Sequence, residues 1–265
     1  MRKQLHIFLL HFQHVFQYRA RNLVWFIESL INPFVLMLFW RGAVGNRATV
    51  GGWTIDQIQS YYLIMIFALV FLMHSVEDII AKKDIKEGNL AHFLLKPYSF
   101  LLLRLHSEAP WRLVQGFYGL IAIITLPPLM QFSIKISSDP FMMFAAILAS
   151  VLAYFISFFY KTIIAFLAFW MTDIHAIVEI QEIFALLFTG VIMPLTFMPS
   201  SIQTIAHFTP LPYIIYYPVT ILLGMHDVDM IIKIIGSQLL WIVGLVLVYK
   251  FMWSRGLRTF TGVGQ

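Results

Sequence analysis

The sequence predicts an all-α, polytopic membrane protein with six transmembrane helices. Three observations predict this class: the 265 residues are 60% hydrophobic and only 12% charged, their mean hydropathy is +0.82, and the apolar residues gather in long stretches between charged loops. In water such a chain would expose a large apolar surface, so we expect lipid as its solvent. The loops are too short for a soluble domain, so residues 1–265 are expected to form a single transmembrane domain.

The amino terminus, residues 1–22, is expected to form a helix that lies on the membrane surface before the first crossing. Its apolar side chains recur at helical spacing and form one stripe, with mostly polar His and Gln side chains off it. The alternative is a plain cytoplasmic extension of the first crossing. The stripe consists of Leu5, Phe8, Leu9, Phe12, Val15 and Phe16.

The expected crossings follow from bilayer thickness, because a helix needs about 20 predominantly apolar residues to span the hydrocarbon core. Six stretches meet this requirement, and they cover residues 23–44, 61–81, 109–131, 141–170, 175–193 and 232–253.

The distribution of basic residues predicts the orientation, since short loops rich in Lys and Arg stay in the cytoplasm. With the amino terminus inside, only Arg41, Arg47, Lys135 and Lys233 of the 18 basic residues lie outside. Lys161 lies within the fourth stretch, and the other thirteen lie inside. Both termini are therefore expected in the cytoplasm. This bias also accounts for the net charge of +5 without nucleic-acid binding.

The loop over residues 82–104 is the expected functional element on the cytoplasmic side. It is the one long cytoplasmic loop between two crossings, and it carries a dense charge cluster. Asp84, Lys86 and Glu87 precede Gly88, which is a natural helix stop. An apolar run then leads to Lys96 and Pro97. The alternative is a solvated loop whose Lys residues only set the topology.

Ionisable residues within membrane helices are candidates for function, since they are costly there. Under this topology the ionisable residues form a polar layer near the cytoplasmic end of the helix bundle. The functional interpretation is that this layer acts as an inner gate. Interfacial or snorkelling side chains are the alternative. The candidates are Glu28, Glu77, Asp78, Lys161, Glu179 and Glu182.

Residues 194–231 are expected to form broken, re-entrant helices on the external side. Several prolines argue against a seventh crossing, because each removes a backbone donor and kinks or ends a helix. Within this segment Pro194, Pro210, Tyr213 and Tyr217 are candidates for the lining of an exit for an amphipathic substrate.

Metal and catalytic sites are not expected. The chain has no Cys, and although His175, Glu179 and Glu182 share one helix face, nothing completes a ligand set. The phosphate loop G-x-x-x-x-G-K-[ST] is also missing, so this chain is not expected to hydrolyse ATP by itself.

Five segments together resemble the permease subunits of type-2 ABC exporters, in particular the bacterial branch with separate permease and ATPase chains. The resemblance covers nearly the whole chain and rests on the order and spacing of the segments. They are DIKEGNLAHFLLKP (84–97), LAFWMTD (167–173), GVIMPLTFMP (190–199), PLPYIIYYPVTILLG (210–224) and WSRGLRTFTGVGQ (253–265).

The resemblance implies a bacterial inner-membrane protein that forms half of the path through an ATP-driven exporter. ATP and Mg²⁺ would bind to two copies of a cytoplasmic ATPase, and a second permease, identical or different, would complete the path among the membrane lipids. The carboxyl and basic residues at 84 and 86 are Asp and Lys here, where Glu and Arg are commoner. The implied ATPase-coupling residues are Asp84, Lys86, Glu87, Gly88, Asn89, Leu90, Lys96 and Pro97.

A second class remains open from the residues alone, namely an ion-coupled secondary transporter or channel. Such a protein places ionisable groups or broken helices near the membrane midplane. In this sequence the acids lie inward and the expected helix breaks lie outward.

Overall fold

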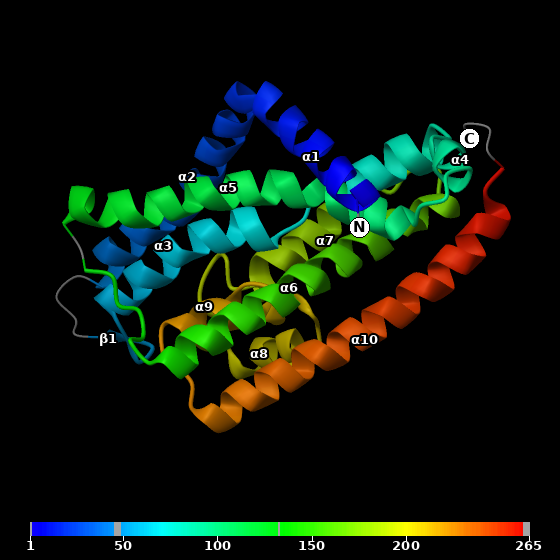
Figure 1. The fold of residues 1–265 in the computed structure, drawn as a ribbon. Helices are drawn as coiled ribbons and strands as arrows, with labels where there is room; N and C mark the ends of the chain where they lie inside the picture. The colour runs from blue at the N-terminus through cyan, green and yellow to red at the C-terminus, as the bar shows by residue number, and fades with distance from the viewer. Residues whose placement is uncertain (1, 45–48, 132, 262–265) are drawn as a thin grey trace.

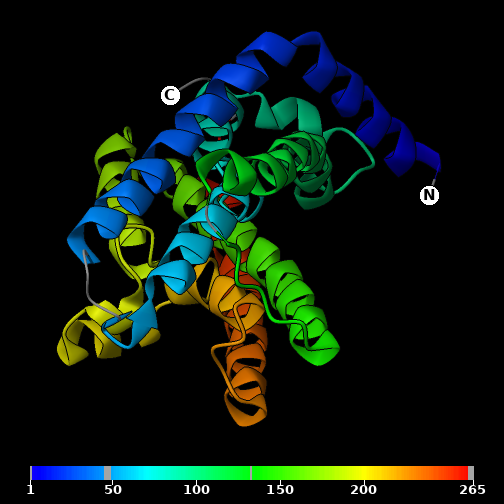
Figure 2. The ribbon, with the colours of Figure 1, turned by 90° about the vertical axis from the view of Figure 1, so that its left-hand side faces the viewer.

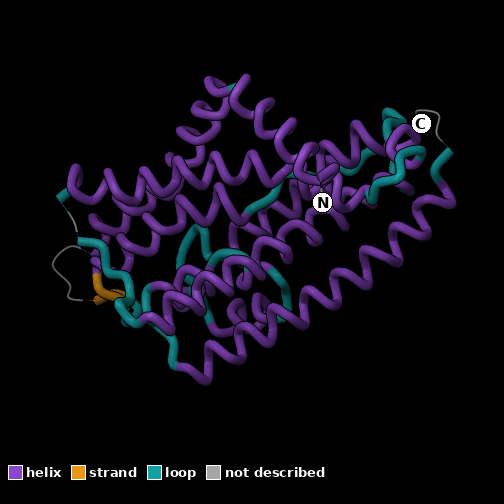
Figure 3. The backbone as a smooth tube through the Cα atoms, viewed as in Figure 1, coloured by secondary structure: helices purple, strands orange, loops and turns teal. Residues whose placement is uncertain are grey.

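The computed structural model describes residues 2–44, 49–131 and 133–261 and shows a bundle of long helices (Figures 1 and 3). Arg47 and the last four residues of the tail segment, 262–265, lie outside the described residues. The long helices are α2 (Arg19–Val44), α3 (Ile55–Leu72), α5 (Phe100–Met130), α6 (Pro140–Phe166) and α10 (Val228–Thr259).

Shorter elements connect these helices. We call the end of the bundle that holds η1 and α4 the α4 end, and the opposite end, with β1 and β2, the hairpin end (Figure 1). The shorter elements are α1 (Arg2–Gln17), β1 (Thr49–Val50), β2 (Trp53–Thr54), the π-helix η1 (Ile79–Lys86), α4 (Leu90–Leu94), η2 (Leu167–Phe169), α7 (His175–Phe188), η3 (Leu195–Phe197), α8 (Ser200–His207), η4 (Leu211–Tyr213) and α9 (Tyr216–Leu222).

Five helices in the described part of the chain are long and apolar enough to cross a membrane: α2, α3, α5, α6 with η2, and α10. The expectation of an all-α membrane protein is confirmed. The fifth expected crossing, 175–193, is instead the 14-residue α7. At 1.5 Å per residue α7 is about 21 Å long, less than the roughly 30 Å hydrocarbon core. The expected count of six spans is therefore not confirmed.

Helix α7 ends at Phe188, and a turn at Gly190 then changes the direction of the chain. Gly190 has a φ of +83°, a left-handed conformation that glycine adopts without strain. Its carbonyl accepts a hydrogen bond of 2.8 Å from the Tyr61 hydroxyl, and the Ile192 carbonyl accepts one of 2.9 Å from the Tyr62 hydroxyl. From there α8 and α9 lead to the hairpin end, where α10 begins (Figure 1).

The segment expected to hold broken helices, 194–231, contains η3, α8, η4 and α9, and α10 begins within it at Val228. Residues 210–221 are all buried against other parts of the protein. Irregular backbone at membrane depth is tolerated where protein covers it. The position of this segment relative to the outer leaflet stays a prediction.

Helix α3 is the central helix of the bundle and differs from the expected second crossing, 61–81. It starts earlier because Thr54 and Gln57 form a capping box, and it ends at Leu72. Residues 73–76 are not helical. There the Arg112 guanidinium donates to the Val70 carbonyl at 3.2 Å, and the His74 backbone N–H donates to the Ser157 hydroxyl at 3.0 Å. Side chains thus replace the missing helix bonds.

At the amino terminus α1 meets α2 at a sharp angle (Figure 2) and packs against α5. The Asn22 amide donates to the Val15 carbonyl at 2.7 Å across the joint. Val15 is buried, whereas Leu9, Leu10 and Phe16 are exposed. The exposed apolar side chains suit a membrane surface, and this role for α1 stays a prediction.

Replacement of Gly190 with alanine is expected to destabilise the protein. The new Cβ would clash with the Tyr61 hydroxyl, and the positive φ would add strain of about 1–3 kcal/mol. Gly244 in α10 is the control, because a Cβ there meets nothing within 4 Å. We expect a lower melting temperature in detergent for Gly190→Ala and an unchanged or higher one for Gly244→Ala. Equal melting temperatures for the two variants would contradict this account of the turn.

Candidate functional site

The expected coupling loop forms a compact structure built from η1, a tight turn and α4. Eight successive residues in a π-helix are unusual, and π-helical segments are frequent at functional sites. The Glu87 N–H donates to the Lys82 carbonyl at 2.9 Å, which is the wide i to i+5 spacing. Gly88 then takes a φ of +77°, and the Asn89 amide donates to the Lys83 carbonyl at 2.8 Å. These contacts end η1 and start α4. We call residues 79–97 the docking element.

Asp84 does not lie on the outer surface of the docking element. Its side chain is buried and forms an ion pair with Arg104 at the start of α5. Burial raises the pKa of the Asp84 carboxyl to about 6, and Arg104 acts in the opposite direction. Leu90 is also buried. Asp84 and Leu90 therefore hold the element against the bundle and do not offer a contact to another protein.

The outer surface of the docking element combines charge with apolar side chains. Lys82, Lys83 and Glu87 are exposed, as are Lys96 and Pro97. Leu94 and Leu95 are exposed as well, and Leu95 at 85%. Lys86 and Asn89 are partly buried. Exposed apolar side chains rimmed by charged ones occur on surfaces that bind another protein or a membrane.

Aromatic side chains connect the docking element to the end of α10. The Arg104 guanidinium lies over the Phe93 ring at 5.3 Å and over the Phe100 ring at 5.7 Å. Phe100 stacks on Trp253 with ring centroids 4.9 Å apart. Trp253 in turn contacts Phe166 at the end of α6. A displacement of the element would thus reach α5, α6 and α10 through packed contacts.

A buried charged layer lies behind the docking element. The Lys161 ammonium of α6 is 2.6 Å from the Glu77 carboxylate, and both side chains are almost fully buried. Lys161 is also 4.0 Å from Glu182 of α7, which is half exposed. On α5, Arg112 is 3.5 Å from Glu108 and donates to the Ser75 hydroxyl at 3.2 Å.

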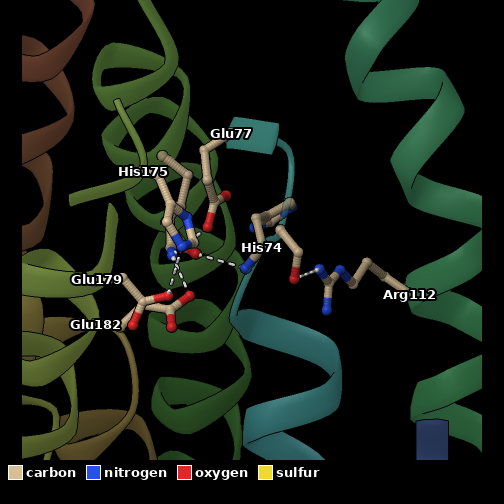
Figure 4. Close-up of polar contacts among 9 residues, drawn as sticks. His74, Glu77, Arg112, His175, Glu179 and Glu182 are labelled. Atoms are coloured by element: carbon tan, nitrogen blue, oxygen red, sulfur yellow. Dashed lines mark hydrogen bonds and ion pairs between the residues drawn. The ribbon is translucent and has the colours of Figure 1, made fainter. Parts of the chain in front are cut away.

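Figure 4 shows how the layer is arranged, with Arg112 on one side of His74 and with Glu77, His175, Glu179 and Glu182 on the other. The His74 ring is buried, and neither ring nitrogen has a hydrogen-bond partner among the described residues. Its ring lies 4.4 Å from that of Tyr154. The layer therefore contains one buried ion pair, a second pair on α5 and an unpaired histidine between them.

The sequence-predicted acids are only partly brought together. Glu77, Lys161 and Glu182 meet, but Glu179 pairs with His175 at 3.7 Å on the exposed face, and Asp78 pairs with Lys82 at 3.0 Å on the surface. Glu28 is exposed on α2. Sequence reasoning missed Arg104, Glu108 and His74. The spacing of Arg104, Glu108 and Arg112 at i, i+4 and i+8 on α5 is a signal that places all three on one helix face.

The four candidates for an external exit are all buried. Pro194 directly precedes η3 and Pro210 directly precedes η4, and Tyr213 packs on Tyr217 with ring centroids 5.0 Å apart. The Tyr217 hydroxyl is 3.0 Å from Nδ1 of His207. In this conformation these residues contribute packing, so a role in an exit path stays a prediction. Within the described ranges no cluster of three His, Cys, Asp or Glu side chains is placed to hold a metal ion.

The long apolar helices define a multi-pass membrane protein, and its buried charged layer lies toward one end of the bundle. The family model for ABC-2 family transporter proteins matches residues 30–264, and the chain therefore belongs to the ABC-2 transporter family. The resemblance inferred from the sequence is thereby confirmed. No curated protein and no solved structure gave a significant match.

Membership identifies the chain as a permease, the membrane component of an ABC transporter. Components of this kind are generally not catalytic themselves, and in general they work with a partner ATPase subunit.

The buried Glu77–Lys161 pair leads to a prediction about stability. Lys161→Met would leave Glu77 as a buried, unpaired charge, and loss of one partner of such a pair costs about 3–5 kcal/mol. Glu179→Gln is the control, because the exposed pair with His175 contributes less than about 1 kcal/mol. Tryptophan fluorescence during thermal unfolding of the purified variants measures both effects.

Adding Glu77→Gln to Lys161→Met should restore part of the lost stability, because the unpaired charge is then removed. A Lys161→Met variant that unfolds at the wild-type temperature would show that the pair is open or hydrated in the protein.

Proposed function

We propose that this chain is the permease subunit of an ATP-driven exporter and that a separate ATPase binds to the docking element. The observation that carries the proposal is the docking element itself. It is fixed to α5 through the Asp84–Arg104 ion pair and the packing of Phe93 on Phe100, and Phe100 stacks in turn on Trp253 of α10. It exposes Glu87 and Leu95. Such an element transmits movement to the bundle when a partner is attached to its outer surface. The α4 end is then cytoplasmic, as are both termini.

The mechanism that we propose is a mechanical one. ATP in the partner draws two ATPase subunits together, and each carries the docking element seated on it. Coupling requires contacts that differ between the two states of the partner. Glu87 and the exposed lysines fix the register of the contact, while Leu94 and Leu95 supply apolar area. The shift would then reach α5 through Arg104 and α10 through Trp253.

The proposal includes a second permease, identical or different. Helix α2 exposes Glu28 among apolar side chains that include Val24, Ile31 and Val35. An acid on a lipid-facing surface is costly, and a facing protein surface removes that cost. Helix α7 likewise exposes Glu179 at its start and a series of apolar side chains beyond it. Two permeases and two ATPases would complete the transporter among the membrane lipids.

Reversal of one charge tests the coupling. Glu87→Lys should reduce both co-purification of the ATPase and ATP hydrolysis by the reconstituted complex, because it opposes the charge that fixes the register. Asp229→Lys is the matched control, since Asp229 is equally exposed but lies at the hairpin end. Insertion into the membrane should be normal for both variants.

If as much ATPase co-purifies with the Glu87→Lys variant as with the wild-type permease, and the complex hydrolyses ATP at the wild-type rate, this docking surface is ruled out. The ion-coupled alternative predicts a different result, namely transport by the purified chain alone, driven by an ion gradient in liposomes without ATP.

A further inference from the structure

An apolar groove of about 390 Å³ lies between α1, α3, α5 and α6, and no residue of the docking element lines it. Its walls come from the amphipathic helix α1 and from three membrane-spanning helices, with Phe71 as the contribution of α3. The side chains that line it include Phe8 of α1, Leu105, Ala109 and Leu113 of α5, and Val151 and Phe155 of α6.

The groove opens toward the membrane. Leu113 and Val151 line it and are also about half exposed, so its rim continues into the lipid-facing surface of α5 and α6. The stretch from Leu105 to Leu113 covers about 12 Å of helix, close to the roughly 15 Å that one leaflet contributes to the hydrocarbon core. A groove of this length with apolar walls matches a lipid chain better than it matches water.

Polar side chains lie at the α4 end of the groove. His106 lines it, and its Nδ1 is 3.2 Å from the Tyr98 hydroxyl. Tyr98 also lines a neighbouring cavity of about 290 Å³ together with His11 and Lys96. Lys96 is exposed, with its ammonium 5.4 Å from the centre of the Phe93 ring. A cation and hydrogen-bonding groups therefore lie beside the polar end of an apolar groove.

We propose that this groove is a binding site for an anionic phospholipid from the leaflet at the α4 end. An acyl chain fills the space between α5 and α6, and the phosphate lies near Lys96, Tyr98 and His106. Arg and Lys beside membrane helices attract anionic headgroups in this way. The lipid would hold α1 against the bundle, because Phe8 of α1 forms one wall of the groove. The site does not depend on the proposed coupling to an ATPase.

Photolabelling tests the chain-binding part of the proposal. The full-length protein in liposomes is irradiated with phosphatidylglycerol that carries a diazirine within one acyl chain, and labelled peptides are identified by mass spectrometry. We expect label on residues 105–113 and 151–155. Ala109→Trp places a large ring in the groove and should abolish the label in both peptides, whereas Leu120→Trp, on the exposed face of the same helix, should not.

The headgroup provides a measurement that does not depend on a bulky variant. In the wild-type protein, the phosphatidylglycerol probe should label the groove more strongly than a phosphatidylcholine probe with the same chains, and Lys96→Gln should remove the difference. The proposal is overturned if the groove is labelled no more strongly than the exposed side chains Phe117, Leu120, Ile121 and Ile124 of α5 and if Ala109→Trp leaves the labelling unchanged. It is also overturned by an unlabelled groove or by equal labelling with the two headgroups in the wild type.

Discussion

The buried ion pair between Glu77 and Lys161 is the interaction on which the arrangement of the α4 end depends. A charge inside a membrane protein is costly unless it is paired, and here both side chains are almost fully buried at a separation of 2.6 Å. Glu77 lies two residues before the π-helix, and Lys161 lies about one turn before the end of α6. The pair therefore fixes the start of the docking element to a membrane-spanning helix, and neither partner is able to move away alone.

The second attachment of the docking element lies at its other side. Asp84 pairs with Arg104 of α5, and Phe100 stacks on Trp253 of α10. Together with the first pair, these contacts connect one short element directly to α6 and α5, and through Phe100 of α5 to α10. The chain is irregular before the first attachment, because α3 ends at Leu72 and residues 73–76 are not helical, and the wide π-helix connects the two attachments. Firm attachment to the bundle combined with an exposed tip is the construction expected of an element that passes on the movement of a bound partner.

Much of the fold was predictable from the sequence, because hydropathy reports directly on which helices are long and apolar enough to cross a membrane. The orientation inferred from the basic residues stays a prediction. The weak point was α7, whose apolar stretch continues past the helix. Hydropathy does not detect that Gly190 turns the chain there and that Tyr61 holds the turn. The end of α3 was missed for a similar reason, since the side chains that replace its helix bonds come from α5 and α6.

The candidate site was predictable in its location but not in its internal geometry. The charge cluster and glycine of residues 84–88 indicated the docking element. The burial of Asp84 depends on Arg104, twenty residues away, and no local pattern reports that contact. The acids of the membrane helices were chosen by depth alone, and depth does not distinguish Glu77, which faces Lys161, from Glu28, which faces outward. The tyrosines of the predicted exit are buried because η4 and α9 fold into the bundle.

Site-directed crosslinking tests the central claim most directly, because the chain has no native Cys to remove. A single cysteine at Leu95, at the exposed tip of the docking element, is compared with one at Phe208, which is 80% exposed beyond α8. With a short bismaleimide and the complete complex, the account predicts a crosslink from position 95 to the ATPase subunit and none from position 208. A cysteine at 95 that gives no crosslink and reacts equally with maleimide in the presence and absence of the ATPase would contradict the account.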